Sequence, residues 1–462
     1  MDPVGGGQYK QAVQQLIEAE SQPIKSLEAK KNKEDARLKL FQEFKTKFSG
    51  LDKSLNEVAT FGKFRELKAD LGDGANLASV TLDKDKAEPG QYIIEIAELA
   101  ARTSVISNGF ANPKDPIMGA GYITLNLQNG ETTEIYIDDK DSSLYGMASL
   151  MNRKAESPVR ASVIRDETDP DAPYKLLLTA KKDGQANQVD YPEFYFLDGS
   201  NDFYIDDNRE AKNAQVTIDG FPIEVASNDI VDFVSGVNLH LKTARPDQPF
   251  TLTISEDYQK IGGKLKGLVD QLNQVLDFIV KQNTVDARTD TTSSFAGDSL
   301  LQSIESRIRN LIHQGYSAGD PDSDHSTLIH LTQLGVEFDK TGHLTFKEEK
   351  FNKLLESNFE MIAEAITGDS GFATQMRQIF NNYNNTQDGL LTLKEKGLKN
   401  RIKQIDEQID QKTKVLERKK EAITNKFAKL ETTMANLQRQ SQYLSASLPS
   451  GGGGSMVSQL IG

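Results

Sequence analysis

The stretch Ile402–Ile423, IKQIDEQIDQKTKVLERKKEAI, decides how this chain folds. Its apolar residues recur every three or four positions, and nearly everything between them is charged or an amide, which predicts a long helix with one narrow apolar stripe. A helix this polar cannot form the centre of a globular core. Its partner must therefore lie elsewhere in the chain or in another copy of it.

The stripe continues in both directions along one helix, predicted from near Leu391 to Leu448 and ended by Pro449 and the tract SGGGGS. Its members follow steps of four and three: Leu398, Ile402, Ile405, Ile409, Leu416, Ile423, Phe427, Leu430, Met434, Leu437, Leu444 and Leu448. Lys412, Lys419 and Ser441 occupy skipped positions, so the pattern is a coiled coil with polar faults.

The N-terminal segment is the natural partner of this helix. From Tyr9 to about Phe61 the apolar spacing is also helical, and Pro23 predicts a break or kink within it. We expect the two chain ends to pair, so that everything between them is an insertion at the tip of a rod. The alternative is that the two ends belong to separate helical domains.

The middle of the chain has the pattern of antiparallel strands. From Val80 to Ile254 apolar and polar residues alternate, and Asn129-Gly130 and Asp219-Gly220 predict tight hairpin turns. One short helix is expected at Ser143 to Asn152. This region predicts one or two inserted, mainly antiparallel β domains.

Helical spacing returns after Asp257, interrupted at Leu334 to Phe346, where Thr341-Gly342 predicts a small hairpin. The predicted fold class is α+β multidomain, with a coiled-coil or helical-bundle leg formed by the paired termini and β domains as a head. The expected boundaries are a terminal leg at 1–42 and 436–462, a helical bundle at 43–75 and 262–435, a β head domain at 76–106 and 208–261, and an inserted β domain at 107–207.

Composition excludes several classes of function. The 462 residues carry a net charge of −14, which argues against a nucleic-acid partner or an anionic membrane surface. There is no cysteine, so disulfides, thiolate zinc sites and thiol nucleophiles are excluded. No run of about 18 apolar residues predicts membrane insertion, and the N-terminus lacks the features of a cleaved secretory signal.

Metal sites are not expected from the sequence. Asp320, Asp322 and Asp324 have the spacing of a calcium loop, but His325 and Leu331 occupy its glycine and glutamate positions. The spacings of twelve and five between His313, His325 and His330 cross a loop and do not fix these histidines on one face.

Catalytic and cofactor sites are not expected either. Gly5-Gly6-Gly7 lacks the lysine and the preceding strand of a phosphate-binding loop. Two acidic pairs lie at the ends of predicted strands beside other charges: Asp138-Asp139 and Asp206-Asp207. We expect them to keep the β domains soluble or to protect a strand edge from pairing, more than to act as a catalytic pair. No serine has the setting of a nucleophile, and no aromatic cluster suggests a sugar-binding platform. We therefore predict no enzyme, no cofactor and no metal.

Five blocks of the chain resemble known flagellar proteins. Residues 142–180, SSLYGMASL onward, are similar to a repeat of flagellar hook and filament proteins. Residues 214–261, AQVTIDGFPIEV onward, resemble the flagellar filament cap family, also called hook-associated protein two. The matching residues are Asp219-Gly220, Ser227-Asn228, Ile230, Gly236-Val237, Leu239, Leu241 and Asp257. Three further blocks are similar to other parts of that family and occur in the same order: QLIEAESQPIKSLEAKK, EPGQYIIEIAELA and LGVEFDKTGHLTFKEEKF.

The resemblance implies a structural protein at the distal tip of the bacterial flagellum. It implies export by the flagellar type III route to an extracellular position, without a cleaved signal, and a homo-oligomeric ring of about four to six chains. The implied partners are flagellin, which the ring retains and helps to fold and insert, the hook-filament junction proteins and an export chaperone. A flagellum-exposed adhesin and another hook-filament junction protein are the alternatives.

The residues expected to bind the filament lie in the two leg helices. They are Val13, Leu16, Ile17, Ile24 and Leu27 near the start of the chain, with Leu430, Met434, Leu437, Leu444 and Leu448 near its end. The beginning DPVGGGQYKQAVQQL and the tail SGGGGSMVSQLIG depart from the family in composition, which affects the terminal contacts more than the resemblance as a whole.

Overall fold

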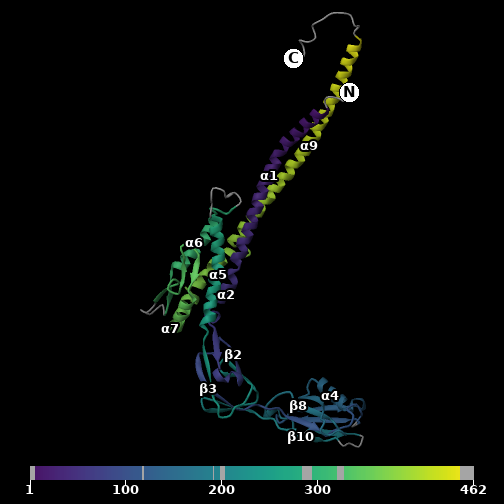
Figure 1. Cartoon of the computed structure of the whole chain (residues 1–462), viewed down its shortest axis with the longest axis vertical. Coiled ribbons are helices and arrows are strands. Elements are labelled where there is room, and N and C mark those ends of the chain that lie inside the picture. Colours follow the sequence, from purple (N-terminus) through teal and green to yellow (C-terminus); the bar gives the residue numbers. More distant parts are fainter. Residues whose placement is uncertain are drawn as a thin grey trace. The chain divides into compact units, whose positions relative to one another are not determined.

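A computed structural model describes residues 6–116, 119–190, 192–197, 203–283, 294–319 and 327–447 (Figure 1). The chain divides into two compact units, unit 1 with Met1–Ala59 and Lys264–Gly462, and unit 2 with Thr60–Gly263. Unit 2 is thus an insertion in unit 1, and both chain ends belong to one unit. The alternative of separate helical domains is wrong, whereas the α+β fold class is confirmed.

Unit 1 is built mainly of helices. The described α-helices are α1 (Gly6–Ser49), α2 (Leu51–Glu57), α3 (Phe61–Phe64), α4 (Leu144–Arg153), α5 (Tyr258–Asn283), α6 (Ser299–His313), α7 (Glu348–Thr367), α8 (Phe372–Asn384) and α9 (Leu390–Ser447). Of these, α3 and α4 lie in unit 2, and α5 begins there. None of the described helices is both long and apolar enough to cross a membrane.

Aromatic side chains of α1 form the centre of the core of unit 1. Phe41, Phe44 and Phe48 are fully buried and recur at steps of three and four on one face of the helix. The Phe44 ring lies 5.5 Å from that of Phe278 on α5, and the Phe48 ring lies 5.5 Å from that of Phe380 on α8. These contacts join three helices that are distant in the sequence.

The helix α1 continues through Pro23, where the sequence predicts a break or kink. A proline removes one main-chain hydrogen bond and crowds the preceding turn, which costs stability in a helix interior. The next residue, Ile24, is only 9% exposed, so packing supports the helix at this point. The break is therefore absent, and α1 ends instead at Ser49 before Gly50 and α2.

Two small hairpins complete unit 1. β16 (Gly315–Ala318) pairs with β17 (Thr327–His330), and β18 (Val336–Phe338) pairs with β19 (Leu344–Phe346). The second hairpin confirms the prediction at Thr341-Gly342, since Gly342 has a φ of 85°. Asn273 of α5 fixes it, because its side chain accepts from the Leu344 N–H and donates to the Leu344 carbonyl, each at 2.8 Å.

Unit 2 contains antiparallel sheets. Its strands are β1 (Leu67–Asp70), β2 (Ala78–Leu82), β3 (Gly90–Glu98), β4 (Ser104–Ser107), β5 (Gly121–Asn126), β6 (Thr132–Ile137), β7 (Val159–Arg165), β8 (Tyr174–Ala180), β9 (Glu193–Phe196), β10 (Ile205–Arg209), β11 (Ala214–Ile218), β12 (Phe221–Val225), β13 (Asp229–Val234), β14 (Val237–Leu241) and β15 (Phe250–Glu256). They form sheets in the orders β1-β15-β3-β11-β12, β13-β14-β2, β10-β4-β8-β7 and β6-β5-β9.

Two separate hydrophobic clusters hold these sheets together. One includes Ile94, Val216 and Leu252 from the five-stranded sheet. The other includes Ile123 and Leu178 together with Met147 of α4, the short helix that the sequence predicts. Unit 2 thus has two cores, each formed by two sheets.

The predicted hairpin turns are confirmed. Gly130 between β5 and β6 has a φ of 90°, and Asp219 and Gly220 between β11 and β12 have φ values of 49° and 84°. At Asp219-Gly220, positive φ at both central residues gives the backbone twist that a two-residue hairpin requires. In the five-residue connection between Asn126 and Thr132, Gly130 has a positive φ but Asn129 does not. The local turn chemistry therefore determines these pairings.

The boundary between the units differs from the expected one. Residues 60–75, which we placed in the helical bundle, belong to unit 2, because β1 pairs with β15 in the five-stranded sheet. The strand is too short for its alternation to be read from the sequence. The finer divisions at 42/43, 207/208 and 435/436 stay predictions.

Candidate functional site: the paired terminal helices

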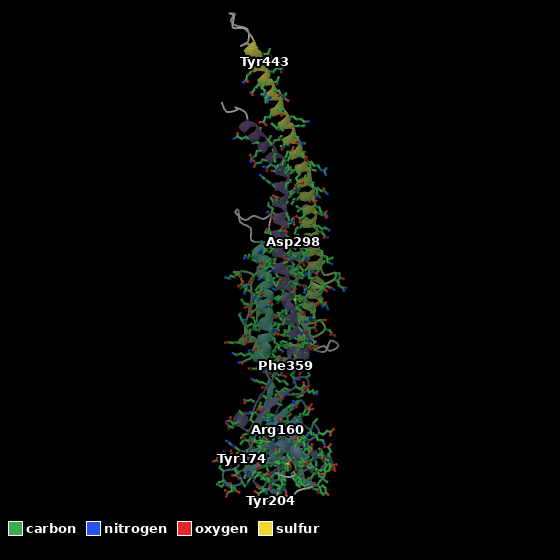
Figure 2. The ribbon with its side chains drawn as sticks, turned by 90° about the vertical axis from the view of Figure 1, so that its right-hand side faces the viewer. Arg160, Tyr174, Tyr204, Asp298, Phe359 and Tyr443 are labelled. Atoms are coloured by element: carbon green, nitrogen blue, oxygen red, sulfur yellow. The ribbon has the colours of Figure 1, made fainter. Side chains whose placement is uncertain are left out.

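The apolar stripe of α9 faces α1 in the structure. The two helices run side by side (Figures 1 and 2). The stripe residues Ile402, Ile405 and Ile409 are half-buried, whereas most of the residues between them are exposed. The stretch that opened the sequence analysis is therefore covered by the N-terminal helix of the same chain.

Ion pairs along both sides of the stripe fix the direction and register of the helix pair. They are Lys45–Glu395 at 2.8 Å, Arg401–Glu34 at 3.4 Å, Lys31–Asp406 at 2.6 Å and Lys419–Glu20 at 2.6 Å. From one ion pair to the next, the residue number in α9 rises while the residue number in α1 falls, so the two helices are antiparallel. Most of these charges are partly exposed, so the pairs specify register more than they add stability.

The base of the helix pair holds the strongest electrostatic contact of this set. Ammonium groups of Lys399 and Lys45 and the amide of Gln42 donate to the Glu395 carboxylate, which lowers the pKa of Glu395 to about 2. The Glu395 side chain is 14% exposed. The carboxylate is therefore ionised through the whole neutral range and ties α9 to α1.

The helix α9 extends beyond α1 at its C-terminal end. Continuing the antiparallel register from Glu20–Lys419, residue for residue, places Gly6 opposite about residue 433. The remaining described part of α9 is roughly 14 residues, or about 20 Å, long. Figure 2 labels Tyr443 on this extension, where α1 no longer lies beside α9.

The structure separates the ten predicted contact residues into two groups. Those of α1 lie in the helix pair: Ile24 is buried, Val13, Ile17 and Leu27 are half-buried, and Leu16 is 45% exposed. Those of α9 are exposed, with fractions of 53% for Leu430, 42% for Met434, 55% for Leu437 and 59% for Leu444. Leu448 lies outside the described residues.

The exposed part of the α9 stripe is the candidate docking surface, which we call the α9 stripe end: Leu430, Met434, Leu437 and Leu444. These side chains share one face, because their steps of four, three and seven match the helical repeat. A polar helix that leaves four large apolar side chains on one exposed face presents a surface that another helix can cover.

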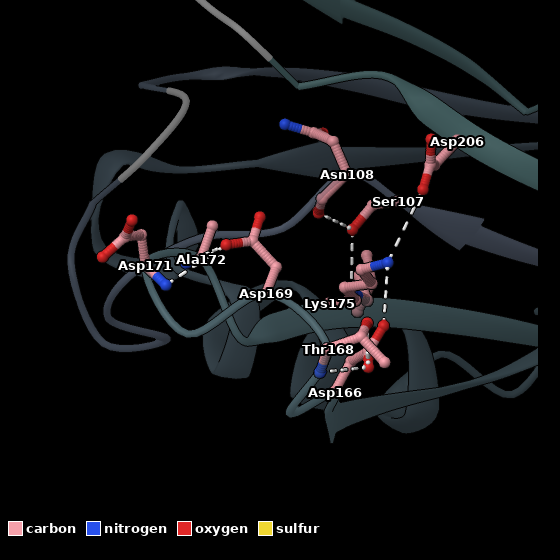
Figure 3. A network of polar contacts seen from close by, with 10 residues as sticks. Ser107, Asn108, Asp166, Thr168, Asp169, Asp171, Ala172, Lys175 and Asp206 are labelled. Carbon is pink, nitrogen blue, oxygen red and sulfur yellow. Dashed lines mark hydrogen bonds and ion pairs between the residues drawn. The ribbon is translucent and has the colours of Figure 1, made fainter.

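The predicted acidic pair Asp206-Asp207 contributes to a network of ion pairs. Asp206 lies 3.6 Å from Lys175, and Lys175 also pairs with Asp166 at 3.1 Å (Figure 3). The hydroxyl and main-chain N–H of Thr168 donate to Asp166, and with Lys175 they lower the pKa of Asp166 to about 2. This network joins β8 and β10 to the loop after β7.

Two of the histidines considered as metal ligands have other contacts. His313 packs its ring 5.5 Å from Phe338, and His330 faces the His313 carbonyl oxygen. His325 and the three aspartates of the calcium-like spacing lie outside the described residues. Within the described ranges, no group of three or more histidine, aspartate or glutamate side chains is placed to hold a metal ion.

One surface feature was missed by the sequence analysis, which found no aromatic cluster. Tyr122, Tyr136 and Tyr195 lie opposite one another on three adjacent strands, because β5 pairs with both β6 and β9. The alternation of β5 and β6 placed Tyr122 and Tyr136 near each other. The position of β9 beside them depends on a long-range pairing that no local pattern encodes.

Known proteins resemble this chain along most of its length. The family model for the flagellar hook-associated protein 2 N-terminus matches residues 6–103, and that for the flagellar hook-associated protein 2 C-terminus matches residues 211–439. The B-type flagellar hook-associated protein 2 of Pseudomonas aeruginosa is 24% identical, with 97% of this chain and 98% of the relative covered. The flagellar hook-associated protein 2 of Xenorhabdus nematophila is 26% identical, with 93% and 95% covered.

A solved structure shares the fold. The crystal structure of the flagellar cap protein D1-D2-D3 domains from Escherichia coli has a TM-score of 0.62 and 21% sequence identity, and covers 78% of this chain and 99% of that chain. At this identity the likeness concerns the fold alone. It supports the arrangement of helices and antiparallel sheets described above.

Proposed function

Because this chain belongs to the flagellar hook-associated protein 2 family, we propose that it caps the distal end of the bacterial flagellar filament as a structural protein with no catalytic step. The Escherichia coli protein that shares its fold is a flagellar cap protein by name. The single observation on this chain that carries the proposal is the exposed α9 stripe end, most of which extends beyond the start of α1.

The α9 stripe end is the part of the chain that docks on the filament. Its four apolar side chains are about half exposed in the single chain, and covering the exposed part of each is worth roughly 1 kcal/mol. A partner helix of flagellin supplies that cover. The low density of apolar residues suits a leg that exchanges partners as the filament grows, because such a helix is only marginally stable alone.

The α1 residues of the predicted contact set act through α9. Ile24 and its neighbours cover the α9 stripe within the same chain, so they position the leg. They contact the filament only where their side chains stay exposed, as that of Leu16 does. The proposal therefore gives the residues of the two helices different roles, whereas the sequence predicts filament contacts for both sets.

Several chains together form the cap. A closed ring of about four to six copies covers the filament opening, retains exported flagellin and promotes its folding and insertion. The chain reaches the filament tip by the flagellar type III route, with an export chaperone, and meets the hook-filament junction proteins before flagellin is added. The solution mass of the full chain, measured by light scattering, tests the ring: a discrete multiple of 51.1 kDa supports it, and a monomer at every concentration opposes it.

A co-sedimentation assay with preformed flagellin filaments tests the docking surface. Leu437→Asp places a charge in the α9 stripe end, and Gln438→Asp adds the same charge one residue along, a quarter turn away from the stripe. We expect the wild-type chain and Gln438→Asp to pellet with filaments. Leu437→Asp should bind at least tenfold more weakly, because the lost burial of leucine and the cost of burying an unpaired carboxylate together exceed about 1.4 kcal/mol.

Circular dichroism provides the folding control for this experiment. Leu437 is already 55% exposed, so its replacement leaves the melting temperature of the chain unchanged. Equal pelleting of Leu437→Asp and Gln438→Asp would remove the α9 stripe end from the docking surface.

A further inference from the structure

A row of three exposed tyrosines crosses the sheet β6-β5-β9. Tyr122 of β5 lies directly opposite Tyr136 of β6 and Tyr195 of β9, so all three side chains stand on the same face of the sheet. The rings of Tyr122 and Tyr136 lie 5.2 Å apart. With strands spaced about 4.8 Å apart, the tyrosine row extends roughly 10 Å across the sheet.

The fold does not need these aromatic rings for its core. The other face of the sheet carries Ile123 and Ile135, which are buried in the hydrophobic cluster beneath. The tyrosines are 39%, 50% and 65% exposed at Tyr122, Tyr136 and Tyr195. Large amphipathic side chains gathered on a solvent face are typical of a surface that binds a partner.

A row of carboxylates lies next to the tyrosine row. Two residues further along each strand, Glu134 and Glu193 flank Thr124 in the same cross-strand register. Both glutamates are exposed, and no described side chain forms an ion pair with either carboxylate. Lys154 donates to the main-chain carbonyl of Glu134 and not to its carboxylate. The two rows are about 7 Å apart along the strands.

The charge of this part of the chain determines which partner fits. Residues 107–207 contain 18 aspartates and glutamates but 9 lysines and arginines, so they supply −9 of the net charge of −14. A second copy of this region would bring like charges together, which opposes self-association at this face. A cationic partner is attracted to it.

We propose that the tyrosine row and the two glutamates form a docking surface for an arginine- or lysine-containing segment of a partner protein. A guanidinium group stacks on the face of Tyr122 or Tyr195, and its N–H groups reach Glu193 in the adjacent row. A second cationic side chain of the partner binds in the same way to the Tyr136 ring and the Glu134 carboxylate. Cation–π stacking and charge pairing thus act together on one side chain. This activity goes beyond filament capping.

Fluorescence anisotropy of the full chain with a labelled peptide of alternating arginine and glycine tests the proposal. Tyr195→Ser removes the most exposed ring of the row and keeps the charge, and Tyr204→Ser removes a similarly exposed ring of unit 2 outside the row. Glu193→Gln and Glu167→Gln form a second pair, each losing one negative charge at an exposed site. Melting curves of the four variants check that folding is retained.

We expect Tyr195→Ser to weaken peptide binding about two- to fivefold, with Tyr204→Ser unchanged, since exposed cation–π contacts are worth ~0.5–1 kcal/mol. Glu193→Gln should weaken binding more than Glu167→Gln. Equal effects within each pair would overturn the proposal, because the peptide would then bind by diffuse charge. A neutral chitotetraose probe that binds through Tyr195 while the peptide does not would assign the row to sugars, and a smaller solution mass of Tyr195→Ser would assign it to contacts between copies.

Discussion

Replacing Glu395 by glutamine should loosen the base of the α1–α9 pair. The pKa of Glu395 falls from 4.5 to about 2 through its contacts with Lys399, Lys45 and Gln42. A shift of about 2.5 units corresponds to an upper bound of about 3 kcal/mol. Lys399 is 54% exposed, so solvent screening reduces this figure, and we expect a loss of about 1–2 kcal/mol in the free energy of unfolding of unit 1 at pH 7.

The pH dependence of this loss gives its electrostatic signature. The folded pKa lies below the unfolded one, so the stabilisation is fully present above pH 4.5 and disappears as the pH falls towards 2. Urea unfolding followed by circular dichroism at 222 nm measures it, because unit 1 contains most of the helix. The difference between wild type and Glu395→Gln should shrink by more than half between pH 7 and pH 3.

Glu407→Gln is the matched control. Glu407 pairs with Lys403 at 4.0 Å within α9, and both side chains are largely exposed, so this change should cost no more than about 0.5 kcal/mol. The reasoning fails if Glu395→Gln and Glu407→Gln have the same effect at pH 7, or if the effect of Glu395→Gln is independent of pH.

Three further changes test other parts of the structure. Asn273→Ala removes both hydrogen bonds to Leu344 in a buried setting and should lower the free energy of unfolding of unit 1 by about 2–3 kcal/mol, measured in urea. Pro23→Ala restores a main-chain donor within α1 and should raise the melting temperature of the helical signal; an unchanged value would contradict a continuous α1. Asp166→Asn should lower the melting temperature of unit 2 at pH 7. That difference should fade as the pH falls from about 4 to 2, since the contacts with Thr168 and Lys175 depress the pKa of Asp166.

Local chemistry made much of the fold predictable. The turns at Asn129-Gly130 and Asp219-Gly220, the short helix α4 and the stripe of α9 depend on residues that are close in sequence, and the structure confirms each of them. Their signals are the positive φ of hairpin turns and the helical repeat. Nothing beyond the immediate neighbours is needed to read them.

Long-range packing decided what the sequence could not show. β1 joins unit 2 because it pairs with β15, and α1 passes through Pro23 because the helix is supported by its neighbours. The tyrosine row depends on β9 lying beside β5. In each case the deciding contact joins residues far apart in the chain, which neither periodicity nor turn residues report.

The candidate site was predictable in composition but not in exposure. The helical repeat identified Ile24 and Leu437 as members of matching stripes. Which of them is covered depends on the register of the helix pair and on the unequal lengths of α1 and α9. Ile24 is therefore buried within the chain, and Leu437 is exposed on the α9 stripe end.

The amount of flagellin released into the medium tests the capping function most directly. Cells that lack their own cap protein are complemented with the wild-type chain, with Leu437→Asp or with Gln438→Asp, and flagellin in the medium and on the cells is quantified at equal export. The account predicts that the wild-type chain and Gln438→Asp restore filaments and retain flagellin, whereas Leu437→Asp leaves flagellin in the medium. Full retention of flagellin by Leu437→Asp would contradict it.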